Sequence, residues 1–251
     1  MRILLLGGTT EAGLLARALA DAGMDAFYSY AGRTEDPPPQ PLPQRIGGFG
    51  GVAGLVDYLQ TEGISHLVDA THPFAERMSR NAVQACDIAD IPLMALERPP
   101  WISGPGDRWT HVGSGGEAAA ALPQTATRVF LAIGRQTLGD FAGVPQHHYL
   151  LRLVDPPKAL PLPDVEIVLG RGPFRLEDDL DLMRRHGVQV VVSKNSGGDG
   201  ARAKLDAARF LGLEVILIDR PALPERACCA TVAEVLEWLH RADFHGTDRG
   251  V

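Results

Sequence analysis

The sequence predicts an α/β protein made of two Rossmann-like parallel-sheet domains with a cleft between them. Three observations support this fold class. Short apolar runs alternate with stretches of helical periodicity along the chain, which is typical of parallel strands connected by helices. A segment rich in proline, glycine and tryptophan at residues 99–106 interrupts this alternation. The chain also has 251 residues, enough for two domains of about 120 residues each.

The first domain is predicted to span residues 1–100. It opens with a strand–helix–strand unit, because an apolar run ends at two glycines and is followed by leucine and alanine residues at helical spacing. A proline-rich loop at 35–44 comes after this unit. The elements expected here are strands at 2–6, 25–30, 66–70 and 92–96 and helices at 11–23, 52–62 and 75–87.

The second domain is predicted to span residues 101–251 and to repeat the alternation. Its last helix has a capping-box spacing, with Thr231 as N-cap and Glu234 three residues later. Because ligands bind beyond the carboxyl ends of strands in open parallel sheets, functional residues are sought there. The elements expected here are strands at 129–133, 149–154, 166–169, 188–192 and 215–218 and helices at 117–122, 176–186, 201–211 and 231–240.

Charge and cysteine content limit the class of function. The chain has 24 basic and 31 acidic residues, and this net charge of −7 argues against a general nucleic-acid binder. Local cationic clusters for an anionic small ligand remain compatible with it. Cys86, Cys228 and Cys229 form neither a disulfide framework nor a metal-binding pair, which fits a reducing cytosol. The apolar runs are too short for a signal peptide or a membrane span, so we expect a cytoplasmic protein without a membrane partner.

The turn after the first strand indicates a dinucleotide site. It reads Gly-Gly-Thr-Thr-Glu-Ala-Gly from residue 7, and Gly8 and Gly13 have the spacing of the outer glycines in GxGxxG. Thr10 takes the place of the middle glycine, where its hydroxyl could donate to a phosphate. The start of the following helix offers N–H groups to an anion. We expect cofactor contacts from Gly8, Thr9, Thr10 and Glu11, although an ordinary strand–helix turn capped by Glu11 is the alternative.

The end of the second strand favours NADPH over NADH. Ser29 lies near the end of this strand and Arg33 follows the strand, with no carboxylate before the arginine. An acidic residue at this place is typical of NAD sites, whereas an arginine suits the 2′-phosphate of NADP. Ser29 and Arg33 are therefore predicted to bind the cofactor, with a solvated loop arginine as the alternative.

The end of the strand at 66–70 carries the sequence Asp-Ala-Thr-His-Pro from residue 69. Thr71 is predicted to bond a ribose or phosphate group of the cofactor. His72 is the catalytic candidate, because it could donate a proton or orient the nicotinamide. Structural roles for His72 and for Asp69 are the alternatives.

Three motifs in this order resemble the precorrin-6A reductase family: residues 7–11, 69–75 and the Ser-Lys-Asn-Ser-Gly-Gly stretch at 193–198. The Asp-Arg-Pro sequence at 219–221 fits as well, and the resemblance runs to about residue 240. It implies a two-domain reductase that uses NADPH to reduce one carbon–carbon double bond of precorrin-6A, giving precorrin-6B in cobalamin biosynthesis. Relatives in the anaerobic pathway act on the cobalt-containing substrate. The cofactor is then expected mainly in the N-terminal domain and the macrocycle in the cleft.

Basic residues follow successive strands of the second domain, as a polycarboxylate macrocycle requires. The glycine-rich stretch at 193–200 adds a possible anion cradle of backbone N–H groups. A surface or salt-bridge role is the alternative for each of them. The predicted residues for binding this anionic tetrapyrrole are Arg135, Arg171, Lys194, Ser196 and Arg220.

Reduction of the double bond requires a hydride from the nicotinamide and a proton from His72, water or another residue. A short-chain dehydrogenase is one alternative, but none of the tyrosines at 28, 30, 58 and 149 has a lysine four residues later. A non-catalytic nucleotide-binding module is the other. The adjacent His147 and His148 lack further ligands at suitable spacing, so no metal site is predicted. Without a heptad seam or a long apolar edge, a monomer is expected.

Overall fold

The computed structural model describes residues 1–32, 38–157 and 159–246, and these form two compact units. The first unit contains residues 1–99 together with the chain from residue 222 onward, and the second contains residues 100–221. Each unit has one six-stranded sheet in which neighbouring strands run parallel. The predicted fold class of two parallel-sheet α/β domains is therefore confirmed.

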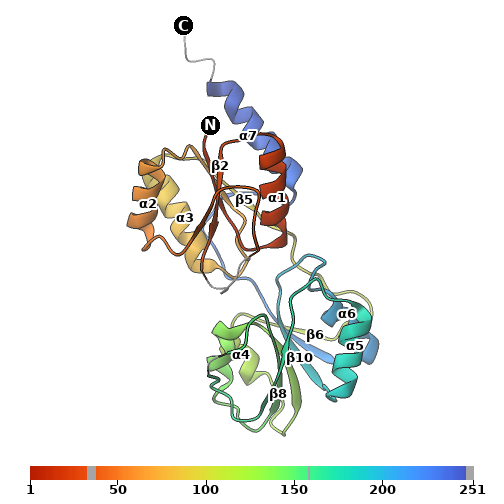
Figure 1. Cartoon of the computed structure of the whole chain (residues 1–251). Helices are drawn as coiled ribbons and strands as arrows, with labels where there is room; N and C mark the ends of the chain where they lie inside the picture. Colours follow the sequence, from red (N-terminus) through yellow and green to blue (C-terminus); the bar gives the residue numbers. More distant parts are fainter. Residues whose placement is uncertain (33–37, 158, 247–251) are drawn as a thin grey trace. The chain divides into compact units, whose positions relative to one another are not determined.

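The sheet of the first unit has the strand order β3-β2-β1-β4-β5-β12, which is the doubly wound order with β12 in the sixth place. Helices α1 and α7 cover one face of this sheet, and α2 and α3 cover the other (Figure 1). The strands are β1 (Ile3–Leu6), β2 (Ala26–Tyr30), β3 (Gln44–Ile46), β4 (His66–Asp69), β5 (Leu93–Leu96) and β12 (Ala227–Cys229). The helices are α1 (Thr10–Asp21), α2 (Val52–Thr61), α3 (Glu76–Ala89) and α7 (Val232–Gly246).

The core of the first unit explains why β1 is apolar throughout. Ile3 and Leu5 pack with α1 and α7 on one face, whereas Leu4 and Leu6 pack with α2 and α3 on the other. A central parallel strand is buried on both faces, and successive side chains alternate between them. The Thr231 hydroxyl and the Glu234 carboxylate form the predicted capping box, with Glu234 N–H donating to Thr231 Oγ1 at 3.3 Å and Thr231 N–H to Glu234 Oε2 at 2.9 Å.

The sheet of the second unit has the order β6-β11-β10-β7-β8-β9, which is again doubly wound when it is followed from β9. Its core lies between β7, β10 and β11 on one side and helices α5 and α6 on the other. The strands are β6 (Trp109–Val112), β7 (Arg128–Ala132), β8 (His148–Leu153), β9 (Val165–Leu169), β10 (Val190–Lys194) and β11 (Glu214–Ile218). The helices are α4 (Gly115–Ala120), the 3₁₀ helix η1 (Arg135–Phe141), α5 (Leu176–Arg185) and α6 (Ala203–Leu211).

The chain from residue 222 belongs to the first unit, which differs from the predicted division at residue 100. Strand β12 pairs in parallel with β5, with Ala227 opposite Met94. Helix α7 then packs Val235 and Leu239 into the core beside α1. These contacts explain why the predicted domain boundary differs from the observed one. Strand β12 and helix α7 follow the second unit in the chain, and their sequences do not indicate which sheet they join. Within the described residues, no helix combines the length and apolar character that crossing a bilayer requires.

Candidate functional site

The glycine turn after β1 is shaped by Tyr28 of the neighbouring strand. A Cβ atom at Gly7 would lie 2.1 Å from Tyr28 Cζ, so the ring occupies the space that a side chain would need. The Gly8 N–H donates to the Tyr28 hydroxyl at 2.8 Å, and Gly8 has a φ of +116°. Burial raises the pKa of Tyr28 well above its ordinary value, so the phenol stays neutral. The turn is thus held by a tyrosine that the sequence analysis did not select.

Thr9 connects the glycine turn to β4. Its hydroxyl donates to the Ala70 carbonyl at 2.8 Å and accepts from the Ala12 N–H at 3.1 Å, which makes Thr9 the N-cap of α1. The predicted cofactor residue Thr9 therefore has a structural role at this end of the sheet. Thr10 and Glu11 begin the helix behind it, where the first N–H groups have no intrahelical acceptor.

Glu11 forms an ion pair with Arg98, which follows β5. Arg98 Nη1 lies 2.6 Å from Glu11 Oε2, and the two side chains are 15% and 23% exposed. The pair joins the start of α1 to the carboxyl end of β5. Arg98 was not predicted as a site residue. It follows a strand directly, as do the basic residues that were predicted to bind substrate in the second domain.

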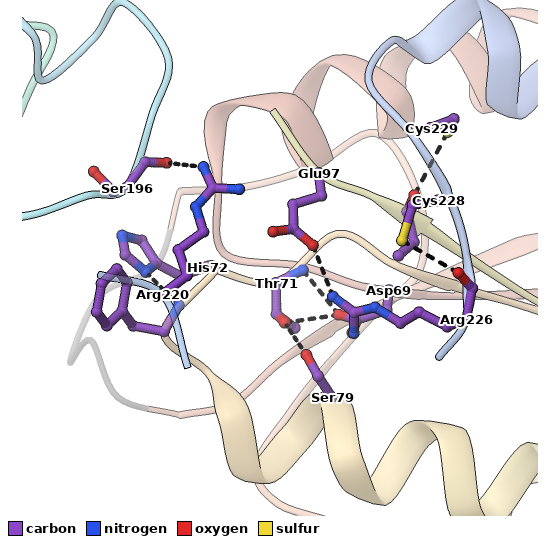
Figure 2. Close-up of polar contacts among 12 residues, drawn as sticks. Asp69, Thr71, His72, Ser79, Glu97, Ser196, Arg220, Arg226, Cys228 and Cys229 are labelled. Atoms are coloured by element: carbon purple, nitrogen blue, oxygen red, sulfur yellow. Dashed lines mark hydrogen bonds and ion pairs between the residues drawn. The ribbon is translucent and has the colours of Figure 1, made fainter. Parts of the chain in front are cut away.

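Asp69 organises the turn after β4 (Figure 2). Its Oδ1 atom accepts from the Thr71 N–H at 3.1 Å and from the Thr71 hydroxyl at 2.7 Å. Its Oδ2 atom accepts from Arg226 Nη1 at 2.8 Å, and Arg226 Nη2 donates to Glu97 Oε2 at 2.9 Å. Ser79 Oγ lies 3.4 Å from Thr71 Oγ1. This cluster of residues 69, 71, 79, 97 and 226 links β4, β5, α3 and the segment before β12.

Arg226 is a buried cation between two carboxylates. Burial alone would lower its pKa, but Asp69 and Glu97 outweigh that effect and the pKa is raised. The side chains of Arg226 and Asp69 are only 7% and 1% exposed. Sequence reasoning missed Arg226 because its partners lie 157 and 129 residues away in the chain.

His72 is half-buried in the turn between β4 and α3. Its Nδ1 atom accepts from the Phe74 N–H at 3.2 Å, and the two rings are 5.8 Å apart. A nitrogen that accepts a hydrogen bond carries no proton, so this geometry places the proton of the neutral ring on Nε2.

A shallow hollow lies at the carboxyl ends of β1, β4 and β5. The switch point of the strand order falls between β1 and β4, which is where ligands bind in doubly wound sheets. Three predicted cofactor residues line the hollow, and Arg98 lies among its other lining residues. The lining residues are Thr9, Glu11, Thr71, Pro73, Leu96, Glu97 and Arg98.

Ser29 is buried at the end of β2 and does not line this hollow. Its hydroxyl accepts from Arg45 Nη1 at 2.9 Å, and Arg45 also donates to the Gly47 carbonyl and stacks over Phe49 at 3.9 Å. Arg45 is thus a cation at this end of β2 that sequence reasoning missed, because it comes from the short strand β3. Arg33, the predicted partner of a 2′-phosphate, lies outside the described residues.

The predicted substrate residues of the second unit follow four of its strands. Arg135 begins η1 after β7, and Lys194 ends β10, so these two flank the switch point of the second sheet. Arg220 follows β11, the next strand along, and its guanidinium donates to the carbonyls of Asn195 at 3.0 Å and Ser196 at 3.1 Å. The structure therefore brings Lys194, Ser196 and Arg220 together. Arg171 follows β9, at the far edge of the sheet.

Trp101 holds the loop that contains Ser196. Its backbone N–H donates to Asn195 Oδ1 at 2.8 Å, and Asn195 Nδ2 donates back to the Trp101 carbonyl at 3.2 Å. The indole N–H donates to the Gly198 carbonyl at 2.8 Å. Asn195 is therefore a structural residue inside the predicted anion cradle, and its side chain is turned toward Trp101.

These features define an α/β protein with two doubly wound domains and a candidate ligand site at the switch point of the first sheet. The chain belongs to the precorrin-6x reductase CbiJ/CobK family, whose model matches residues 2–240. The family that the three motifs predicted is therefore confirmed, and with it an oxidoreductase of cobalamin biosynthesis.

Relatives and a solved structure match over nearly the full chain. The chain is 62% identical to a precorrin-6A reductase of Rhodobacter capsulatus, covering 100% of this chain and 99% of the relative. It is 31% identical to a cobalt-precorrin-6A reductase of Priestia megaterium, covering 94% and 97%. A solved structure described as CobK precorrin-6A reductase superposes with a TM-score of 0.93 at 62% identity, covering 96% of each chain.

Proposed function

We propose that this chain reduces one carbon–carbon double bond of precorrin-6A with NADPH, giving precorrin-6B. The observation that carries this proposal is the doubly wound order of the first sheet, with the glycine turn, the start of α1 and Thr71 at its switch point. A nicotinamide dinucleotide is the cofactor class that such a site takes. The full-length relationship to a protein named precorrin-6A reductase supports the substrate.

The metal-free macrocycle is the favoured substrate. Relatives named precorrin-6A reductase share 62%, 50%, 47% and 42% of their residues with this chain. Relatives named cobalt-precorrin-6A reductase share 31%, 27% and 33%. Because the first group is more similar throughout, we assign this chain to the metal-free reaction.

The residues of the first unit fit NADPH. Thr10 and Glu11 would present backbone N–H groups at the start of α1 to the pyrophosphate, whose charge the helix dipole favours. Gly8 has open space where a Cβ would stand, which allows close approach of a ligand. Arg45, near the end of β2, and Arg33 would supply positive charge to the 2′-phosphate. Ser29 would act through Arg45, since its hydroxyl is bonded to that guanidinium.

The second unit would hold the carboxylates of the macrocycle. Arg135 and Lys194 flank the switch point of its sheet, and Arg220 lies after the next strand. Ser196 lies in the glycine-rich loop that Arg220 fixes, and Arg171 would reach a carboxylate farther along the sheet edge. Five polar groups on strand ends suit a large polyanion better than a small substrate.

NADPH supplies the hydride when it is bound, and reduction of the double bond also requires one proton. We assign this proton to the imidazolium form of His72. The ring would take up a second proton from water on Nδ1, which then gives up its contact with the Phe74 N–H, and would donate from Nε2 to leave a neutral imidazole. The turn between β4 and α3 would hold the imidazole beside the nicotinamide. The protein's other contributions are orientation of the two reactants and exclusion of water.

The test is a titration of the purified chain with NADPH and with NADH, followed by nicotinamide fluorescence. We expect tighter binding of NADPH, a selective loss of NADPH affinity in Arg33→Ala, and no change in Arg17→Ala. Arg17 is an exposed arginine of α1 and serves as the matched control. Consumption of NADPH on addition of precorrin-6A then tests the reaction. Failure to bind either nucleotide would overturn the proposal.

A further inference from the structure

We infer that Arg226 is a positioning residue that makes the Thr71 hydroxyl a hydrogen-bond acceptor for a donor group on the nicotinamide half of the cofactor. The donor would be the carboxamide NH₂ or a ribose hydroxyl. This inference rests on the proposed use of NADPH and deepens it. It assigns a role to a residue from the carboxyl-terminal part of the chain and excludes a phosphate as the partner of Thr71.

The direction of the Thr71 hydrogen bond follows from proton counting. A threonine hydroxyl has one proton, and a carboxylate can only accept. Asp69 Oδ1 accepts from the Thr71 hydroxyl at 2.7 Å and also from its N–H, so the single hydroxyl proton is directed at Asp69. In the 3.4 Å contact with Ser79 Oγ, Ser79 is then the donor. One lone pair of Thr71 Oγ1 remains for a ligand, and the ligand group must be a donor.

Arg226 maintains this polarity. Its Nη1 atom donates to Asp69 Oδ2 while Thr71 uses Oδ1, so the carboxylate is held from both sides (Figure 2). A guanidinium can only donate, and Arg226 Nη1 lies 2.8 Å from Asp69 Oδ2, so both oxygens of this carboxylate act as acceptors and its orientation toward Thr71 is fixed. Arg226 also pairs with Glu97 at 2.9 Å. Its single positive charge thus offsets one of the two negative charges at these strand ends, beside the place where the phosphates of NADPH are expected.

The position of Thr71 selects the nicotinamide half. The 2′-phosphate end of the cofactor is expected at the end of β2, on one side of β1, with the pyrophosphate at the start of α1. Strand β4 lies on the other side of β1, and Thr71 follows it and lines the hollow. The part of the cofactor that reaches β4 is therefore the nicotinamide riboside. Its carboxamide and ribose hydroxyls are donors, whereas ionised phosphate oxygens only accept.

A double-mutant cycle tests whether Arg226 acts through Thr71. The variants are Thr71→Val, Arg226→Lys and the pair, with Arg17→Lys as the matched control on the surface of α1. Lysine keeps the charge but cannot bond both carboxylates in the fixed geometry of a guanidinium. We expect Thr71→Val to weaken NADPH binding roughly fivefold, the worth of one neutral hydrogen bond. Arg226→Lys should have a similar effect alone and none in the Thr71→Val background. Additive losses would overturn the inference, as would unchanged binding in Thr71→Val.

Three ligands, titrated by calorimetry, separate this role from a structural one. The first is 2′,5′-ADP, which lacks the nicotinamide half and should bind equally well to the wild-type chain and both variants. An equal loss for 2′,5′-ADP in Arg226→Lys would mean that Arg226 only holds the fold, and the inference would fall. The others are NADP⁺ and its 3-acetylpyridine analogue, in which a methyl group replaces the carboxamide NH₂. If the analogue removes the effect of Thr71→Val, the donor is the carboxamide; if the effect persists, the donor is a ribose hydroxyl.

The two proposals fail in different ways. If the wild-type chain binds neither NADPH nor 2′,5′-ADP, the proposed cofactor is wrong and this inference falls with it. If the wild-type chain binds both but Thr71→Val leaves the NADPH affinity unchanged, only the role of Thr71 and Arg226 is wrong. Thermal unfolding of each variant by circular dichroism confirms that the titrated protein is folded.

Discussion

The ring of Tyr28 fills the space above Gly7, and its hydroxyl accepts a hydrogen bond from the next residue in the turn. A Cβ at position 7 would meet Tyr28 Cζ at 2.1 Å, far inside van der Waals contact. The first glycine of the turn is therefore required by a neighbouring strand of the protein itself. This contact explains a glycine that would otherwise be assigned to the cofactor.

Gly7→Ala is expected to destabilise the first unit. Overpacking of this kind costs about 1–3 kcal/mol, because the tyrosine or the strand must move. Gly13→Ala is the matched control, since a Cβ there would meet only the end of Gln40 at 3.6 Å and alanine is the better helix former. Urea unfolding of the two variants measures the difference. Equal stability of Gly7→Ala and the wild-type chain would show that Tyr28 moves without cost.

Arg98→Ala is expected to weaken NADPH binding roughly fivefold. The reason is that Glu11 would keep its negative charge at the start of α1 without the guanidinium 2.6 Å away, and like charge near a phosphate costs on the order of 1 kcal/mol. Glu11→Gln in the Arg98→Ala background should restore most of the affinity. The loss should also shrink as salt concentration rises. Fluorescence titrations at two salt concentrations check this, and a salt-independent loss would point to packing instead of charge.

His72→Ala is expected to lower kcat of precorrin-6A reduction by a factor of about 10² or more, the usual contribution of a general acid. The Kd for NADPH should change little, because the proton is needed only in the chemical step. His66→Ala offers a control at a half-buried histidine at the opposite end of β4. Single-turnover kinetics separates the chemical step from binding. An unchanged rate in His72→Ala would assign the proton to water or another group.

The parts of the molecule that local sequence determines could be predicted. The apolar run of β1, the helical spacing of α1 and the Thr231–Glu234 capping box each depend on residues within one short segment, and the structure has all three. The family could also be predicted, because its three motifs are local sequences that stand in a fixed order.

Residues that act through distant partners could not be predicted. Arg226 reaches Asp69 only because β12 occupies the sixth place of the first sheet, and a three-residue strand has too little pattern to reveal that. Arg45 lies on another three-residue strand, β3, within a region read as irregular. Tyr28 contacts the glycine turn through strand pairing, which no spacing along the chain encodes. In each case the missing information was which strand lies beside which.

His147 makes the stability of the second unit depend on pH. Its side chain is fully buried, and neither ring nitrogen has a hydrogen-bond partner among the described residues. Burial lowers the pKa of His147 from its ordinary value of 6.5, so the folded chain binds this proton less readily than the unfolded chain. The free energy of unfolding should therefore fall as the pH drops below about 6.5, by at most about 1.4 kcal/mol per pH unit from this one group.

His147→Leu should remove this part of the pH dependence. His148→Leu, which changes an adjacent histidine paired with Asp164 at 2.8 Å, should leave it in place. Urea unfolding from pH 7.5 to pH 5.5 gives the slopes. The two chains differ only at residue 147. Identical slopes for the wild-type chain and His147→Leu would therefore mean that the buried ring is protonated or hydrogen-bonded in the folded state.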